Sequence, residues 1–198
     1  MKERRRFRLI YLLLWLPVKL LFPVRVQNRE RVPEGAMVLC APHSSMIDPV
    51  LLMMALGIRC FPRFMAKQEL FEKPLLGGIL RGMGVFPVDR GKADMQAIRT
   101  AMGILKAGGI LGIFPEGTRV HTEGTGSARS GAIMLASHTG APLVPVWLSR
   151  EKKPFRKVDV VFGEPYALPR ISGGSDGYRP YADELMARIG ALKREERR

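Results

Sequence analysis

Hydrophobic and polar positions alternate along this chain with two different periods. Segments with an apolar residue at every third or fourth position are typical of helices, and the clearest, residues 93–107, is followed by Gly108 and Gly109. The C-terminal run 178–198 has the same period and ends in charged residues. Between such segments lie short apolar runs that predict strands: residues 37–41, 61–66, 85–88, 110–114, 143–148 and 158–162. The alternation predicts a single α/β domain with a largely parallel sheet flanked by helices.

The first residues of the chain have a pattern of their own. Basic residues precede an apolar run, as in a secretory signal, but no small-residue cleavage site follows. The longest uncharged stretch, residues 9–18, reaches only ~15 Å as a helix, whereas the hydrocarbon core of a bilayer is ~30 Å thick. Aromatic residues typical of a membrane interface occur in the same segment: Tyr11, Trp15 and Phe22. We expect residues 1–25 to form an amphipathic interfacial anchor ahead of a domain over 26–198. A buried N-terminal helix with a basic tip is the alternative.

Composition narrows the class of partner. The chain has 198 residues and is 46% hydrophobic, which suffices for one sizeable core. Its 32 Lys and Arg against 18 Asp and Glu give a net charge of +14, which indicates an anionic partner. Because the charge is dispersed and lacks an aromatic-and-basic signature, we expect lipid head groups or a phosphorylated small molecule rather than nucleic acid. Cys40 and Cys60 each lie in an apolar stretch, which favours reduced core thiols in a cytoplasmic setting.

The first candidate for chemistry is a histidine with a carboxylate five positions further on. His43 follows the predicted strand 37–41, and Asp48 begins the next apolar segment. A neutral imidazole takes a proton from an attacking hydroxyl when a carboxylate holds its other nitrogen, and such a base contributes roughly 10²–10⁴-fold in rate. We therefore expect His43 to be a general base that Asp48 orients. Asp48 before Pro49 is also typical of a helix N-terminus, and the two carboxylate oxygens allow both roles.

A second candidate is the arginine that ends the segment GVFPVDR, residues 84–90. Arg90 follows a predicted strand, and a guanidinium at that position binds a phosphate through two parallel hydrogen bonds, which a lysine cannot do. We expect Arg90 to bind phosphate, although an isolated arginine at a strand end is equally compatible with an ordinary surface residue.

The third candidate is the segment FPEGTR, residues 114–119. Its proline and glycine predict a tight turn that presents Glu116, Thr118 and Arg119 at one edge of the sheet. We expect Arg119 to neutralise a phosphate and Glu116 to accept a hydrogen bond from an acceptor hydroxyl or from an arginine. A turn with a surface ion pair, worth ~0–1 kcal/mol, is the alternative.

These motifs, taken in order with the run Val144, Pro145, Val146, resemble those of the lysophosphatidic acid acyltransferase family of membrane-associated glycerolipid acyltransferases. The resemblance covers roughly residues 26–166, and FPEGTR is its most specific part. The family's motif positions fall on these residues: His43, Ser45, Asp48, Arg90, Glu116, Gly117, Arg119 and Pro145. One departure is Pro42, where the family commonly has Asn, so any part that this side chain plays in setting the loop passes to backbone rigidity.

The resemblance implies a glycerolipid acyltransferase fold and the transfer of a fatty acyl group from acyl-CoA or acyl carrier protein. The acceptor it implies is the free hydroxyl of 1-acylglycerol 3-phosphate, and the product is phosphatidic acid for phospholipid biosynthesis. It implies no metal and no other cofactor. Lys67 and Arg129 lie in segments similar to the family's and are further candidates for the phosphate pocket. The expected partners are thus a lysophospholipid acceptor, a thioester donor and the cytoplasmic face of a membrane, reached through the N-terminus.

Several alternatives stay open or are disfavoured by particular residues. The acceptor could instead be glycerol 3-phosphate or another lysophospholipid, and a more distant alternative is a non-enzymatic basic protein on a membrane surface. A serine hydrolase is disfavoured because no Gly-x-Ser-x-Gly elbow is present. Cys40 lies within a predicted strand, which favours an inert thiol over a nucleophile. His121 and His138 lack a spaced carboxylate and are expected to be surface or packing residues, so no zinc site is expected. The sequence leaves the oligomeric state open.

Overall fold

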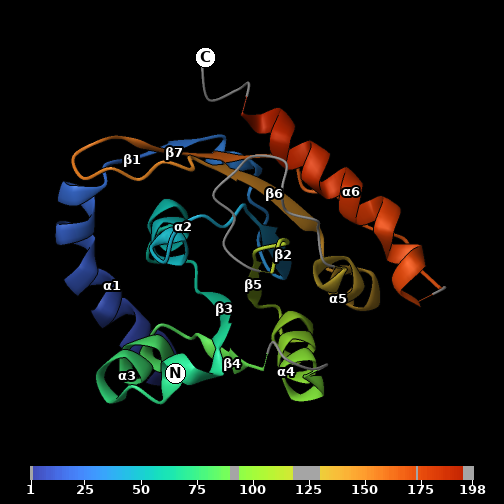
Figure 1. Cartoon of the computed structure of the whole chain (residues 1–198), viewed down its shortest axis with the longest axis horizontal. Coiled ribbons are helices and arrows are strands. Elements are labelled where there is room, and N and C mark those ends of the chain that lie inside the picture. Colours follow the sequence, from blue (N-terminus) through green and yellow to red (C-terminus); the bar gives the residue numbers. More distant parts are fainter. Residues whose placement is uncertain (1, 90–93, 118–129, 173, 194–198) are drawn as a thin grey trace.

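We describe the protein from a computed structural model, in which residues 2–89, 94–117, 130–172 and 174–193 are described. Within these residues, a seven-stranded sheet runs through the centre of the molecule in the order β1-β7-β6-β2-β5-β3-β4 (Figure 1). Neighbouring strands are parallel except β6 and β7, which confirms the predicted, largely parallel sheet. The strands are β1 (Val24–Gln27), β2 (Met37–Cys40), β3 (Pro62–Lys67), β4 (Phe86–Val88), β5 (Ile110–Ile113), β6 (Leu143–Leu148) and β7 (Val158–Phe162).

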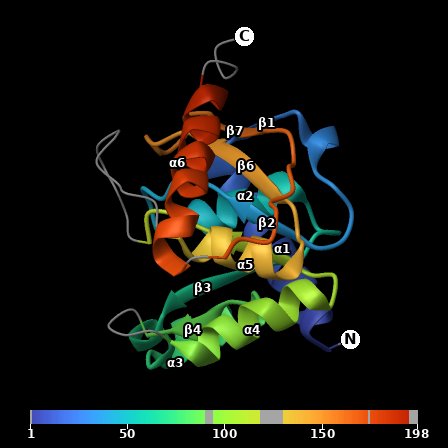
Figure 2. The ribbon, with the colours of Figure 1, turned by 90° about the vertical axis from the view of Figure 1, so that its right-hand side faces the viewer.

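Helices cover both faces of the sheet, as the turned view in Figure 2 also shows. On one face lie α1 (Lys2–Leu21) and α2 (Asp48–Leu56), and on the other α4 (Met95–Lys106), α5 (Gly131–Thr139) and α6 (Gly174–Leu192). The remaining helix, α3 (Pro74–Gly82), packs against α1, and two short 3-10 helices, η1 (Arg29–Arg31) and η2 (Gln68–Phe71), complete the described elements.

The buried central strand β2 divides the hydrophobic core into two. Leu39 belongs to the cluster shared with α1 and α2, whereas Val38 and Cys40 belong to the cluster shared with α4, α5 and α6. Successive side chains of a strand point to opposite faces, so a strand that is apolar at every position fits a sheet covered on both sides. This is why the sequence around β2 reads as a continuous apolar run instead of an alternating one.

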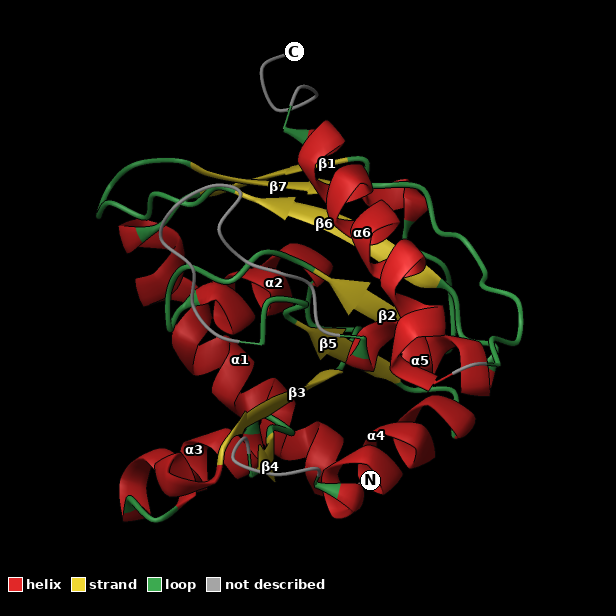
Figure 3. Cartoon of the chain, turned by 45° about the vertical axis from the view of Figure 1, so that its right-hand side comes forward, coloured by secondary structure: helices red, strands yellow, loops and turns green. Residues whose placement is uncertain are grey.

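Parallel pairing brings the carboxyl ends of β2, β3, β4, β5 and β6 to the same edge of the sheet (Figure 3). The loops after these strands carry nearly every candidate residue of the sequence. In open α/β sheets this edge is where ligands bind. The fold therefore places residues from separate parts of the chain on one side of the molecule.

Helix α1 has two apolar faces. Phe7, Tyr11 and Val18 are buried in the core, and the Phe7 ring lies 4.7 Å from the ring of Phe61. On the opposite face, large apolar side chains are exposed at helical spacing: Leu9, Leu12, Leu13, Leu16 and Leu20. The helix continues through Pro17 to Leu21. Among the described residues, no helix has the length and apolar content that crossing a membrane requires.

Six strands and the helix over 93–107 were predicted correctly, the latter as α4. Asp94 caps this helix by accepting a hydrogen bond from the Ala97 amide at 2.9 Å, and Gly108 follows its end with a φ of 76°. Strand β1 was not predicted, because its four residues pair only with the distant β7. The C-terminal helix begins at Gly174, ahead of the predicted start, and contains Pro180 in its first turns.

Candidate active site

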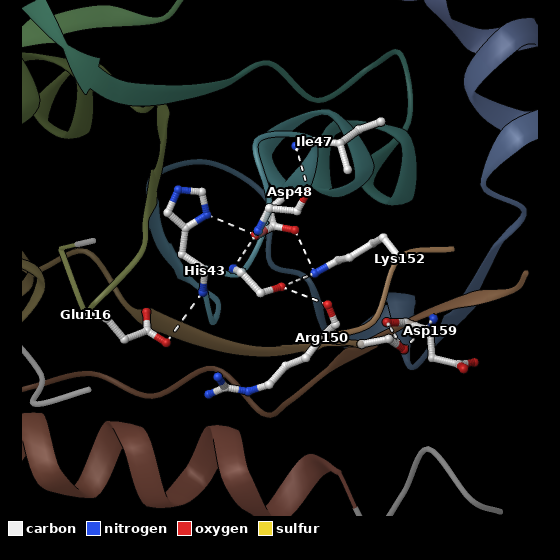
Figure 4. Close-up of polar contacts among 10 residues, drawn as sticks. His43, Ile47, Asp48, Glu116, Arg150, Lys152 and Asp159 are labelled. Atoms are coloured by element: carbon white, nitrogen blue, oxygen red, sulfur yellow. Dashed lines mark hydrogen bonds and ion pairs between the residues drawn. The ribbon is translucent and has the colours of Figure 1, made fainter. Parts of the chain in front are cut away.

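His43 lies in the loop after β2, and Asp48 is the first residue of α2 (Figure 4). The Nδ1 atom of His43 is 2.9 Å from Oδ2 of Asp48. Because a carboxylate only accepts, Nδ1 carries the hydrogen of the neutral ring and Nε2 keeps a lone pair. The predicted pairing of the two residues is thus present, in the tautomer that a general base requires.

The imidazole of His43 is also held by an aromatic ring stacked on one of its faces. It stacks on the ring of Phe114, with centroids 4.1 Å apart and planes 17° from parallel, and Phe114 in turn stacks on Phe64. Gly112 makes room for this stack, since a side chain there would collide with the Phe64 ring. Only 12% of the His43 side chain is exposed. The stack on Phe114 therefore fixes the plane of the ring, and the hydrogen bond to Asp48 fixes its rotation within that plane.

Asp48 is fully buried and binds three donors through one oxygen. Besides His43, its Oδ2 accepts hydrogen bonds from the amides of Ser44 at 2.7 Å and Ser45 at 2.8 Å. Burial alone would raise the pKa of Asp48, but the hydrogen bond from His43 and the charge of Lys152 outweigh it and hold the pKa below its ordinary value. Asp48 is thus ionised, and it fixes the loop rather than capping α2, whose N-cap is Ile47 without a side-chain bond.

Lys152 was not predicted, yet it contacts the same carboxylate. It lies in the loop after β6, the parallel neighbour of β2, and its Nζ is 2.7 Å from Oδ1 of Asp48. Burial lowers the pKa of Lys152, and its ion pair with Asp48 opposes that effect. In the sequence the residue sits in the run Glu151, Lys152, Lys153, which looks like solvated surface. Only the expectation that β2 and β6 are neighbours could have singled it out.

The tight turn predicted at FPEGTR is present directly after β5. Gly117 has a φ of 68°, and its amide donates to the carbonyl of Phe114 at 2.9 Å. Glu116 is only 4% exposed, and its Oε1 accepts a hydrogen bond from the backbone amide of His43 at 3.4 Å. Burial raises the pKa of Glu116, and the hydrogen bonds from its own amide and from that of His43 only partly oppose this. The acid therefore ties the β5 turn to the His43 loop, a partner that the sequence did not indicate.

A cavity of about 360 Å³ opens beside His43 between the sheet and helices α4 and α5. Its lining is mostly apolar and includes Ile98, Ala101, Ile113, Ala132 and Leu135. A cavity of this size and composition is typical of a site for an apolar ligand. His43 is a polar group at its wall.

The remaining candidates divide into those the structure places and those it does not describe. Lys67 ends β3 at the same sheet edge, but its Nζ pairs with the exposed Glu69 at 2.7 Å and does not contact His43 or Asp48. Four predicted substrate-binding residues lie outside the described residues: Arg90, Thr118, Arg119 and Arg129. His121 also lies outside the described residues.

The structure also describes the other reactive side chains considered from the sequence, two cysteines and a histidine. Cys40 is fully buried in β2, and burial together with the nearby Glu116 raises the pKa of its thiol far above the ordinary value. Cys60 is likewise a free thiol. His138 lies in the last turn of α5, where its Nδ1 is 2.9 Å from the carbonyl oxygen of Met134. Burial favours an inert thiol for Cys40, and His138 is an exposed surface residue.

Comparison with known proteins places this geometry in a family. The sequence profile described as Acyltransferase matches residues 23–149, which contain the His43–Asp48 pair, the β5 turn and Pro145. This chain belongs to the acyltransferase family.

Acyltransferases from several bacteria resemble it over most of their length. It is 36% identical over 178 residues to the 1-acyl-sn-glycerol-3-phosphate acyltransferase of Bacillus subtilis, covering 85% of this chain and 84% of that protein. It is 30% identical over 197 residues to the enzyme of the same name from Streptococcus pneumoniae, covering 94% and 71%. The crystal structure of the lysophosphatidic acid acyltransferase PlsC from Thermotoga maritima superposes with a TM-score of 0.67 at 25% identity, covering 88% and 73%. Both the sequence and the fold of this acyltransferase are thus those of its family.

Proposed function

We propose that this acyltransferase moves a fatty acyl group from a thioester to the free hydroxyl of 1-acyl-sn-glycerol 3-phosphate and so makes phosphatidic acid. The observation that carries the proposal is the His43–Asp48 pair, in which the imidazole of His43 lines a largely apolar cavity. The names of the relatives from Bacillus subtilis and Streptococcus pneumoniae support this acceptor. A general base next to an apolar pocket is the combination that transfer of a fatty acyl group requires.

In the proposed reaction, Nε2 of His43 accepts the proton of the acceptor hydroxyl while its oxygen attacks the thioester carbonyl carbon. The new C–O bond forms, the C–S bond breaks through a tetrahedral intermediate, and the imidazolium returns the proton to the departing thiolate. Asp48 stabilises the imidazolium through the hydrogen on Nδ1. Donor and acceptor must then be bound together, and the products are the ester and the free thiol.

Direct attack, without a covalent acyl-enzyme, is supported by the surroundings of His43. Among the described residues, no serine or cysteine side chain contacts its ring. The hydroxyl of Ser44 instead donates to the carbonyl of Arg150 at 3.0 Å, and it accepts from Lys152 at 2.6 Å. Mass spectrometry of protein mixed with acyl-CoA alone tests this step. We expect no adduct, whereas a stoichiometric acyl adduct that disappears on adding acceptor would replace the mechanism with a ping-pong one.

The two substrates are proposed to occupy different parts of the site. The cavity between the sheet and helices α4 and α5 takes the acyl chain of the donor, carried by CoA or acyl carrier protein, because its lining is mostly apolar. Arg90 and Arg119 bind the acceptor phosphate so that its hydroxyl meets His43, with Lys67 and Arg129 as further ligands. Glu116 and Gly117, in the turn after β5, would border this site, and the substrate-binding role expected of Thr118 stays a prediction. These assignments rest on the family's motifs and on the shared sheet edge.

The membrane surface is proposed to bind the exposed face of α1. Five leucines on this face, including Leu9 and Leu13, are exposed, and basic residues crowd the first turns of the helix. An amphipathic helix of this kind lies in the head-group layer, and its basic residues are attracted to anionic lipids. Residues 1–25 would thus act as a peripheral anchor on the cytoplasmic face, with the acyltransferase domain over 26–198.

A direct assay tests the proposed function. Purified protein in detergent is given acyl-CoA and, in turn, 1-acylglycerol 3-phosphate, glycerol 3-phosphate and a lysophospholipid without a free phosphate. We expect transfer mainly to 1-acylglycerol 3-phosphate, with a loss of at least ~10²-fold in His43→Ala. The matched control is His138→Ala, which removes a histidine from the far end of α5 and should retain activity. A folded His43→Ala protein with wild-type activity would falsify the proposal.

A further inference from the structure

Lys152 is a buried lysine that the family's motifs do not contain. Only 4% of its side chain is exposed, compared with 71% for the adjacent Lys153. It also lies beyond residue 149, where the match to the family profile ends. Lysines are almost never buried unless they are paired, because removing an ammonium group from water is unfavourable. A buried lysine at this place therefore calls for a partner, and its partner is Asp48.

We propose that Lys152 is a positioning residue for acyl transfer, which holds Asp48 against His43 and offsets the negative charge that the imidazole faces. The inference rests on the proposed function, in which His43 is the base. According to this inference, a residue of the loop after β6 supports the catalytic pair at the loop after β2.

The positioning follows from how the two carboxylate oxygens are divided. Oδ2 of Asp48 accepts from His43 and from two backbone amides, while Oδ1 pairs with Nζ of Lys152 at 2.7 Å. His43 and Lys152 thus lie on opposite sides of the carboxylate (Figure 4). Rotation of the carboxylate about its bond to the rest of the side chain would break contacts at both oxygens. Lys152 therefore fixes the plane in which Asp48 meets the imidazole.

A second contact of Lys152 ties the two loops together. Its Nζ donates to the hydroxyl of Ser44 at 2.6 Å, and that hydroxyl donates to the carbonyl of Arg150 at 3.0 Å. The hydroxyl of Ser44 thus bridges the ammonium group of Lys152 and the backbone carbonyl of Arg150, which joins the residue after His43 to the loop of Lys152. A side chain that only balanced charge would not need this second bond.

The electrostatic part follows from the charged groups around His43. Asp48 and Glu116 contact His43, and the cations of Lys152 and Arg150 act on these two carboxylates. Asp89 and Asp94 line the same cavity as His43, and Phe114 covers one face of the ring. Buried Asp48 is ionised, so without Lys152 its negative charge would favour the protonated imidazole over the neutral one. A base that is already protonated cannot accept the hydroxyl proton. Lys152 therefore offsets the charge of Asp48 that the imidazole faces.

The test is the pH dependence of kcat/KM for acyl transfer in Lys152→Met and Lys152→Arg. For Lys152→Met we expect kcat to fall about tenfold or more, little change in KM for the acceptor, and an acid limb that moves up by about one pH unit. Lys152→Arg keeps the positive charge, so its acid limb should stay close to that of the wild type even if kcat falls. Lys153→Met is the matched control, because it removes the neighbouring exposed charge, and its profile should match the wild type.

Each outcome decides the inference. A folded Lys152→Met protein whose acid limb stays in place, or a control that moves it equally, would overturn the electrostatic role. If Lys152→Met does not fold, Lys152→Gln retains a hydrogen-bond donor for Asp48 without the charge and should show the same upward movement. If neither variant folds, the residue is structural and the inference is wrong. Retained activity in His43→Ala would instead overturn the proposed function, so the two failures are distinguishable.

Discussion

Two regions depart from ordinary protein structure in opposite ways: the outer face of α1 and the His43 cluster, which consists of His43, Asp48 and Lys152. In the cluster, charged groups are buried: Asp48 has no exposed surface, and four donors surround its two oxygens. On α1, apolar groups are exposed: Leu13 is 77% exposed and Leu9 is 69% exposed. Buried polar groups and exposed apolar patches are the informative exceptions to the hydrophobic rule.

The difference lies in where each group finds its partner. The charges of the cluster are satisfied inside the protein, so its geometry is set before substrate arrives, which suits the general base that we propose. None of the described residues covers the leucines on the outer face of α1, and in the proposed function their partner is a membrane surface. In the proposed function, the preorganised polar site carries out the chemistry and the exposed apolar face of α1 gives access to lipid.

The largest expected effect comes from breaking the apolar face. In Leu13→Glu combined with Leu16→Glu, we expect binding to vesicles of anionic phospholipid to weaken on the order of a hundredfold, because burying one leucine is worth ~1.5–3 kcal/mol. Thermal stability should barely change, since both side chains are exposed. Vesicle sedimentation measures the binding.

Met95→Glu is the control for this measurement, because it adds a negative charge at an exposed apolar position of α4, on the other face of the sheet. It should bind vesicles nearly as well as the wild type. If the double α1 variant also sediments like the wild type, the membrane contact lies elsewhere in the molecule.

A smaller effect, on the preference for acyl chain length, is expected from changes in the cavity. Its mostly apolar lining includes His43 of the polar cluster. Ala101→Leu adds three carbons to the cavity wall and so shortens the space for the acyl chain. Each methylene of the chain that can no longer be buried costs ~0.8 kcal/mol of binding. We expect the kcat/KM ratio of long-chain to medium-chain acyl-CoA to fall by about tenfold or more.

Ile98→Ala enlarges the same cavity and should shift the preference toward longer chains. An unchanged preference in both variants would show that the donor chain binds at another place.

The smallest effect concerns the buried acid of the β5 turn. Because burial raises the pKa of Glu116 above its unfolded value of 4.5, ionising it destabilises the fold, and this loss is absent below that value and complete above the folded pKa. Glu116→Gln should therefore gain melting temperature relative to the wild type as pH rises from about 4 to 7, by a few degrees. Thermal unfolding of both proteins at the two pH values measures it. A Gln variant that becomes relatively less stable toward neutral pH would show that the carboxylate is favourably bound.

The fold could largely be predicted because its strands are continuous apolar runs. Buried parallel strands such as β2 and β6 stand out against amphipathic helices, and Gly108 punctuates the end of α4. Strand β1 was missed because its burial comes from pairing with β7, more than a hundred residues away. The buried face of α1 was considered only as an alternative, since Phe7 and Tyr11 are spaced like the leucines of the exposed face.

In the site, local spacing predicted local geometry and little else. His43 and Asp48 are five residues apart, so one loop brings them together, and the 2.9 Å contact confirms the pairing. The bond from the His43 amide to Glu116 and the contact with Lys152 join loops far apart in sequence, and they depend on the order of strands in the sheet. Lys152 and Lys153 look alike in the sequence, and only the packing of the β6 loop onto β2 makes one buried and the other exposed.

The measurement that tests the central claim most directly is a double-mutant cycle of His43→Ala and Asp48→Asn, in folded proteins, with kcat for acyl transfer as the readout. If Asp48 acts through the imidazole, each single variant loses roughly 10²–10⁴-fold and the double variant is no slower than the slower single one. A double variant whose loss equals the product of the two single losses would contradict the account, because the two residues would then act independently.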